Sequence, residues 1–285
     1  MAYLQYDPLV LEQIQKIELE ILAEFVRICN KYSLDYFLNY GTLLGAIRHK
    51  GFIPWDDDVD VCMPRKDYEQ FLKISEKEFN GKFKLSGPDV KNHYYNLILN
   101  ISKVGTRFCT SYDHGNYHIG IFIEIYPYDS LAENLKERKR QIRKTAFFQQ
   151  LYLVYNVDFL KNSVSKTAKN FFPRLVSYIV HILLHLFHVH EDWIIRKHHE
   201  ASTAYNGKSS ILAQFVAGVV EEGSLQFNDL YPLREVPFEN IMVKIPNQYD
   251  KLLRSLYGDY MQLPPEDQRQ NHYPYLLEFH DGIDN

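Results

Sequence analysis

The sequence predicts an α/β protein of the α+β kind, in which a mixed β-sheet forms the core and a helical segment is added to it. Two stretches, 58–63 and 119–126, alternate apolar residues with acidic or small ones, which indicates strands with two different faces. A third stretch, 131–220, has helix-like spacing throughout. We therefore expect three parts, which are a core over 1–130, a helical region over 131–220, and a C-terminal hairpin and helix over 221–285 that complete the core.

Bulk composition narrows the class of protein. The chain of 285 residues is long enough to bury a substantial core, and its net charge of −4 gives no sign of nucleic acid as a partner. Its three cysteines, Cys29, Cys62 and Cys109, are widely spaced, which argues against a disulfide framework and favours a reducing compartment. The chain does not begin with a basic segment followed by an apolar one, so we predict no secretory signal and a cytoplasmic location.

The N-terminal elements follow from residue spacing. Asp7 and Pro8 form a good helix start, and apolar residues then recur at three- and four-residue steps as far as Tyr32. The other elements expected in the first eighty residues, besides the acidic strand described next, are a short strand over 36–39, a helix over 43–49 that ends at Gly51, and a helix that begins at Pro64.

The most informative stretch is the acidic strand that follows Trp55. Because side chains alternate along a strand, Asp58 and Asp60 project from one face while the valines between and after them enter the core. Two neighbouring carboxylates repel each other, and a hard divalent cation with oxygen ligands removes that repulsion. The pattern therefore predicts Mg²⁺ or Mn²⁺ bound by Asp58 and Asp60, with Asp56 in support.

Two other interpretations of these aspartates are weaker. Clustered aspartates often form a solvated acidic turn, and Asp56-Asp57 alone fits that description. An EF-hand loop is the second alternative, since its first three ligand positions match, but it requires glycine where this sequence has Val61. Pro64 also falls inside the supposed loop, so we favour a catalytic metal site.

A third carboxylate is predicted on the strand over 119–125. Isoleucines alternate there with Gly120, Phe122 and Glu124, which places Glu124 on the face opposite the isoleucines. The neighbouring residues are consistent with an active-site position, because the small residue Gly120 lies on the same face and Tyr126-Pro127 follows. The alternative, which this strand alone does not exclude, is a solvent-facing residue on a half-exposed sheet.

The helical region contains two unusual stretches. Lys136–Lys144 is strongly basic, and we expect it to form a solvated helix face. The functional alternative is a contact with anionic lipid or pyrophosphate. Leu175–Val189 is the most apolar run, but it is shorter than the ~20 residues that a bilayer span requires. It is expected to be a packed helix or one lying on a membrane surface. A metal site formed by its histidines is a further alternative, at positions His181, His185 and His188.

The C-terminal part predicts a hairpin followed by a helix. The strands of the hairpin are expected over 235–238 and 241–245. Asn247 is the expected cap of a helix that runs through Tyr257 and ends at Gly258.

The order of these motifs resembles the fingerprint of the nucleotidyltransferase fold. In that fold a helix N-terminus after Gly-Ser or Gly-Thr, here Gly41-Thr42, contacts phosphate, and three carboxylates hold divalent metal. At finer detail, three blocks of this sequence resemble those of the LicD family, namely 41–72, Gly120–Asp129 and Tyr257–Arg269. The helical middle, 131–220, carries no motif that matches.

The resemblance implies a reaction. Members of the LicD family transfer phosphorylcholine from CDP-choline to sugars of teichoic acid or lipopolysaccharide, and CMP leaves. By that resemblance Asp58 and Asp60 bind the metal with Asp56 nearby, and the catalytic residues are Asp58, Asp60 and Glu124. The family often has aspartate where this chain has Glu124, so the carboxylate reaches one methylene further, as metal ligand or as the base that accepts the acceptor's proton.

Donor and acceptor contacts are expected around this motif. Trp55 is the candidate aromatic partner of the trimethylammonium group. The acceptor is expected to be a lipid-linked glycan, which places the enzyme at the inner face of the plasma membrane as a peripheral protein. The alternatives are another CDP-alcohol such as CDP-ribitol, nucleotidyl transfer, or a non-catalytic module that binds glycan precursors. Candidate diphosphate ligands, each of which is also consistent with a surface cation, are Arg48, Lys50, Arg65 and Lys103.

Overall fold

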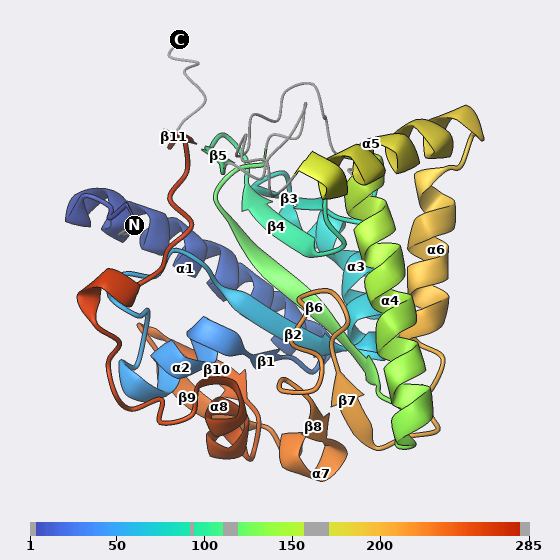
Figure 1. The fold of residues 1–285 in the computed structure, drawn as a ribbon. Helices are drawn as coiled ribbons and strands as arrows, with labels where there is room; N and C mark the ends of the chain where they lie inside the picture. Colours follow the sequence, from blue (N-terminus) through green and yellow to red (C-terminus); the bar gives the residue numbers. More distant parts are fainter. Residues whose placement is uncertain (1–3, 92–93, 111–118, 157–170, 280–285) are drawn as a thin grey trace.

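The computed structural model describes residues 4–91, 94–110, 119–156 and 171–279, and it confirms the α/β class (Figure 1). The helices are α1 (Pro8–Tyr32), α2 (Tyr40–Arg48), α3 (Arg65–Phe79), α4 (Leu135–Asn156), α5 (Phe171–Leu186), α6 (Glu191–Ser202), α7 (Phe227–Leu230) and α8 (Tyr249–Tyr257), with a 3₁₀ turn at Glu266–Gln268. The strands are β1 (Phe37–Leu38), β2 (Asp60–Pro64), β3 (Phe83–Ser86), β4 (Leu99–Lys103), β5 (Arg107–Cys109), β6 (Phe122–Ser130), β7 (Ile211–Ala213), β8 (Leu225–Gln226), β9 (Arg234–Phe238), β10 (Ile241–Ile245) and β11 (Leu276–Glu278).

The central sheet is mixed, and its register brings the acidic residues together. Its strands follow the order β1-β2-β6-β4-β3, with β7 paired to the far end of β6 and β8 paired to β7. Only the β2–β6 pair is parallel among the described strands, and there Asp60 lies opposite Glu124. On the other side of β6, Asn100 of β4 lies opposite Glu124. Three polar side chains from neighbouring strands therefore share one face of the sheet.

The two faces of this sheet differ sharply in character. The residues between the acidic ones, such as Val61, Ile123 and Ile125, are fully buried and belong to the main core. Helices α1 and α3 pack on the sheet, and Phe25 of α1 contacts Phe71 of α3 with ring centroids 5.1 Å apart. The predicted N-cap of α1 is confirmed, because the side chain of Asp7 accepts from Leu9 N at 2.9 Å.

The helical region is an addition at one edge of the sheet. Figure 1 shows α4 and α6 side by side, with α5 lying across their ends. The prediction of helix as far as residue 220 is wrong beyond Ser202, where α6 ends, because turns follow and Ile211–Ala213 form strand β7. That strand pairs with the end of β6, where Asp129 lies opposite Ala213. A three-residue strand is too short to show the alternation that would have identified it.

Smaller differences concern the boundaries of elements. Helix α2 begins at Tyr40, three residues before the predicted start, and β6 runs on to Ser130. The predicted cap Asn247 is wrong, because α8 is preceded by Gln248 while the Asn247 side chain accepts from Arg234 Nε at 3.0 Å. Among the described helices, none is both long enough and apolar enough to cross a bilayer.

Candidate active site

The acidic site is assembled from the start of β2, the middle of β6 and the loop before β2. Asp60 and Glu124 are directly paired across two parallel strands. Asp58 lies in the loop two residues before Asp60, because β2 begins at Asp60 and not at the predicted position 58, and its charge raises the pKa of Asp60. Asp56 and Asp58 converge beside α2, where a Cβ added to Gly41 would lie 2.8 Å from Asp56 Oδ2 and 4.0 Å from Asp58 Oδ1. The missing side chain of Gly41 therefore makes room for these carboxylates.

Burial and mutual repulsion disfavour the charged forms of these acids. Burial, followed by the neighbouring carboxylates, raises the pKa of Asp56 and of Asp60 well above the usual range, and burial also raises the pKa of Asp58. Burial raises the pKa of Glu124 to about 7, although the hydrogen bond donated by the Tyr126 hydroxyl opposes that change. Such a site attracts a positive charge.

The donor set fits a divalent cation in its chemistry. Asp56, Asp58, Asp60 and Glu124 offer only carboxylate oxygens, the ligands preferred by Mg²⁺, and each is destabilised by the charge of another. In the part of the chain that the structure describes, no three Asp, Glu, His or Cys side chains are arranged as a ready ligand shell. A cation would therefore draw these carboxylates together.

Helix α2 is fixed to the acidic strand through its first turn. The backbone N–H of Asp60 donates to Thr42 Oγ1 at 2.8 Å, and Asn39 N donates to Asp60 O at 3.2 Å. Thr42 is buried, so its hydroxyl holds α2 against β2. Gly41 lies beside the carboxylates, on the side where a phosphate would approach the helix N-terminus.

The structure does not bring the predicted diphosphate cations together. Arg65 is partly buried and forms a bidentate pair with the buried Asp129, with donor–acceptor distances of 2.9 and 2.5 Å. Lys103 pairs with Glu20 at 2.6 Å, and Arg48 donates to the carbonyl of Tyr260 at 2.7 Å. The remaining candidate, at position 50, is exposed on the loop after α2. Their positions lend no support to the prediction that they bind diphosphate.

Two site residues were missed from the sequence, Asp57 and His272. Asp57 is buried and accepts from Tyr6 OH at 2.5 Å and from His272 N at 2.8 Å, so it fastens the C-terminal segment to the site. The ring Nδ1 of His272 lies 3.3 Å from Asp57 Oδ1 and 3.4 Å from Asp58 Oδ2. The hydrogen bond to Asp57 and the charge of Asp58 raise the pKa of His272 to about 10. A single histidine in a polar tail carries no pattern that would identify it.

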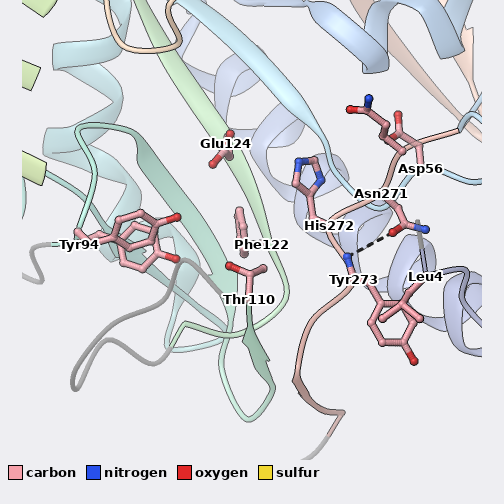
Figure 2. A pocket seen from close by; sticks show the side chains of 11 residues that line it. Leu4, Asp56, Tyr94, Thr110, Phe122, Glu124, Asn271, His272 and Tyr273 are labelled. Carbon is pink, nitrogen blue, oxygen red and sulfur yellow. Dashed lines mark hydrogen bonds between the residues drawn. The ribbon is translucent and has the colours of Figure 1, made fainter. Parts of the chain in front are cut away.

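A cavity of about 550 Å³ opens beside the carboxylates (Figure 2). Figure 2 shows Glu124 and Phe122 on the same strand, with Tyr94 on one side of the cavity and His272 on the other. Trp55 is not among the described residues that line it, and the guanidinium of Arg269 lies 4.4 Å from the centre of the Trp55 ring. The lining residues are Leu4, Asp56, Tyr94, Tyr95, Thr110, Phe122, Glu124, Gln270, Asn271, His272 and Tyr273.

The predicted histidine cluster of α5 serves packing within the described residues. His181 Nδ1 lies 2.9 Å from the carbonyl oxygen of Val154, and the ring of His185 stacks on Tyr155 at 4.6 Å. Both contacts join α5 to α4. The basic stretch Lys136–Lys144 is mainly exposed along α4.

Comparison with known proteins finds similarity to one family and to two curated proteins. The family model described as LicD/FKTN/FKRP, nucleotidyltransferase domain, matches residues 33–169. The chain is 26% identical to the lipopolysaccharide cholinephosphotransferase LicD of Haemophilus influenzae, in an alignment that covers 93% of this chain and 96% of that protein. It is also 26% identical to the uncharacterized protein RP689 of Rickettsia prowazekii, with 60% of this chain and 75% of that protein covered.

Proposed function

We propose that this chain, which is similar to the LicD family in its sequence, transfers phosphorylcholine from CDP-choline to a sugar hydroxyl of a cell-surface glycan precursor, such as teichoic acid, and releases CMP. The similarity to a cholinephosphotransferase along almost the whole chain supports transfer of phosphorylcholine. The observation that carries the proposal is the cavity itself, in which carboxylates from β6 and from the loop before β2 face aromatic side chains.

The reaction is an in-line displacement at phosphorus. The acceptor oxygen forms a bond to the phosphorus that carries choline, the bond to the CMP oxygen breaks, and the hydroxyl proton passes to a base. Glu124 is the candidate base, because a pKa near 7 lets its carboxylate accept a proton at neutral pH. The hydroxyl of Tyr126 donates to Glu124 Oε2 and orients it.

Asp58 and Asp60, with Asp56 and Glu124 beside them, are the residues that would hold Mg²⁺ or Mn²⁺. When bound, the cation would offset the negative charge that develops on the phosphoryl oxygens. The protein's own part is to keep these carboxylates on adjacent strands, with Thr42 holding α2 in register at the start of β2.

The acceptor is proposed to be lipid-linked and to be reached at the cytoplasmic face of the membrane without a span. Helix α5 supports this, because its outward residues are apolar, and Leu186 and Phe187 at its end are 64% and 72% exposed. The C-terminal end of α4 lies between α5 and the cavity. There the Tyr152 hydroxyl donates to the carbonyl of Tyr94, which lines the cavity, at 2.9 Å. One turn further along α4, Tyr155 stacks on His185 of α5. A lipid carrier at α5 would therefore lie close to the site.

The test is CMP release from CDP-choline with and without Mg²⁺, using a membrane-derived or synthetic glycan acceptor. We expect metal-dependent release in the wild type that is lost in Asp58→Asn and in Asp60→Asn, whereas Asp192→Asn, an exposed acid on α6, serves as the matched control. Greater release from CDP-ribitol would instead identify a different CDP-alcohol as the donor. Pyrophosphate release would identify nucleotidyl transfer, and silence with every donor, without metal binding, would leave a binding module.

A further inference from the structure

Part of the cavity lining is aromatic, and carboxylates form another part of it. Tyr94 and Tyr95 come from the segment between β3 and β4, and their ring centroids lie 4.4 Å apart. Phe122 lies two residues before Glu124 on β6, so both side chains project from the same face of that strand. Figure 2 shows Tyr94 and Phe122 flanking the space in front of Glu124.

These aromatic side chains are held in place by the surrounding fold. Tyr94 is only 3% exposed, and its carbonyl accepts from the Tyr152 hydroxyl of α4. Phe122 packs edge-on against Phe108 of β5, with ring centroids 5.8 Å apart. Rings fixed in this way offer a contact surface that loses little conformational freedom when a ligand binds.

The wall suits a quaternary ammonium group better than a polyol. A trimethylammonium group has no N–H to donate, so it is held by the faces of aromatic rings and by nearby negative charge. The cavity supplies such ring faces in Phe122 and Tyr95, next to the acidic site. A ribitol chain would place hydroxyl groups against the ring of Phe122, where they find no hydrogen-bond partner.

The residue favoured from the sequence, Trp55, is in a different position. One face of its ring carries the guanidinium of Arg269, and His49 contacts it edge-on with ring centroids 6.4 Å apart. A donor headgroup would have to displace Arg269 before it could stack on that face of Trp55, and Trp55 does not line the cavity in the described chain. The ring of Trp55 therefore packs the C-terminal segment against the loop before β2.

We propose that Phe122 and Tyr95, supported by Tyr94, form the subsite that binds the trimethylammonium headgroup of the donor and selects a choline-bearing nucleotide over a polyol-bearing one. This proposal rests on the proposed function, because it assigns one end of the same donor. Tyr152 is a positioning residue in this scheme, because it acts only through the backbone of Tyr94.

The test is calorimetric binding of CDP-choline and of CMP to the full chain and its variants. Phe122→Leu and Tyr95→Leu keep an apolar side chain and remove the π face, and each is expected to raise the Kd of CDP-choline about 5- to 30-fold. The Kd of CMP should stay unchanged in both. Phe147→Leu, which replaces a phenylalanine that is 59% exposed on α4, is the matched control and should change neither constant.

The outcomes separate this proposal from the proposed function. Wild-type transfer from CDP-choline together with unchanged CDP-choline binding in both variants would overturn the subsite and leave the reaction standing. Equal weakening of CMP and CDP-choline would also overturn it, since the rings would then act on the nucleotide. A wild type that binds CDP-choline no better than CMP and releases no CMP would overturn both proposals.

Discussion

Two regions of this molecule depart from the usual distribution of polar and apolar residues, and they do so in opposite ways. At the sheet, Asp60 is 7% exposed and lies beside other carboxylates. On helix α5, large apolar side chains face outward, and Phe187 just beyond it is among the most exposed in the described chain. Buried charge and an exposed apolar patch are the observations that carry information about function.

The difference indicates which kind of partner each region would bind. The sheet site brings several carboxylates together, and among the described cations His272 is the one that lowers their pKa values. Helix α5 exposes several large apolar side chains that the described part of the protein does not cover. We propose that a small divalent cation binds at the first region and that a lipid surface contacts the second, and the proposed reaction needs both. The predictions below separate the two requirements.

The largest effect is expected when the charge at the sheet is reduced. Asp60→Asn and Asp58→Asn keep the side-chain shape and should lower CMP release roughly a thousandfold. In the absence of metal the same variants should unfold at a higher temperature than the wild type, because one of the repelling carboxylates is gone. Activity assays and thermal unfolding in EDTA measure the two effects.

Lower activity together with higher stability in EDTA distinguishes a metal-binding aspartate from an aspartate with a structural role. A structural aspartate such as Asp57, which accepts from Tyr6 and His272, should lose stability on the same change to Asn. If Asp60→Asn loses both activity and stability, the carboxylate is a structural partner and the comparison between the regions fails.

The contrast also shows what a sequence can and cannot reveal. The alternation of Asp58, Val59 and Asp60 is local, so it predicted both the core face and the acidic face. Glu124 was predicted as a third carboxylate, but its pairing with Asp60 is visible only in the structure. Tyr94 and His272 lie at the cavity and make long-range contacts with Tyr152 and Asp57, which no local pattern indicates.

Other failures have the same origin. The apolar stripe of α1 was predicted because its period is local, whereas strand β7 is held by pairing with the end of β6 and with β8, both far away in the sequence or too short to show a pattern. Charged residues such as Arg65 show the limit most clearly, since the sequence gives the guanidinium but not the buried Asp129 that engages it. Partners that lie far apart in the chain leave no local pattern.

The second prediction sharpens the comparison with an ordinary buried group. His198 of α6 is buried, and burial lowers its pKa from 6.5 to about 4. Above pH 6.5 the ring is neutral in the folded and unfolded states alike. As pH falls from 6.5 to 4 only the unfolded state gains a proton, so the free energy of unfolding should drop by about 3 kcal/mol over that window.

Chemical unfolding across this pH range measures the effect. His198→Gln should remove the slope, while His190→Gln, a change at an exposed position, should keep it. A slope that persists unchanged in His198→Gln would assign the acid sensitivity to other groups.

The third prediction returns to the sheet. A cation that binds only the folded protein should stabilise it by about 2.7 kcal/mol when Mg²⁺ is present at a hundredfold excess over its Kd. Thermal unfolding of the wild type should therefore move to higher temperature with Mg²⁺. Asp58→Asn should abolish the shift, and Asp192→Asn should preserve it. A shift of equal size in Asp58→Asn would place the cation elsewhere.

The smallest effect is expected on α5, where the contact is spread over many side chains. Ile182→Ser with Leu186→Ser should reduce binding to lipid vesicles about tenfold, because each change removes apolar surface from the contact. Transfer to a soluble acceptor should not change, since neither residue lines the cavity. Vesicle sedimentation and the CMP assay measure the two quantities on the same preparation.

Varying the lipid composition of the vesicles distinguishes apolar from electrostatic binding of the protein to the membrane. Binding through the apolar face of α5 should persist on neutral vesicles and in high salt, whereas binding through the basic stretch Lys136–Lys144 should require anionic lipid and weaken as salt screens it. Unchanged sedimentation of the α5 double variant, together with strong salt dependence, would shift the membrane contact to α4. The exposed side chains of α5 would then need a protein partner, and the two regions would no longer serve one reaction.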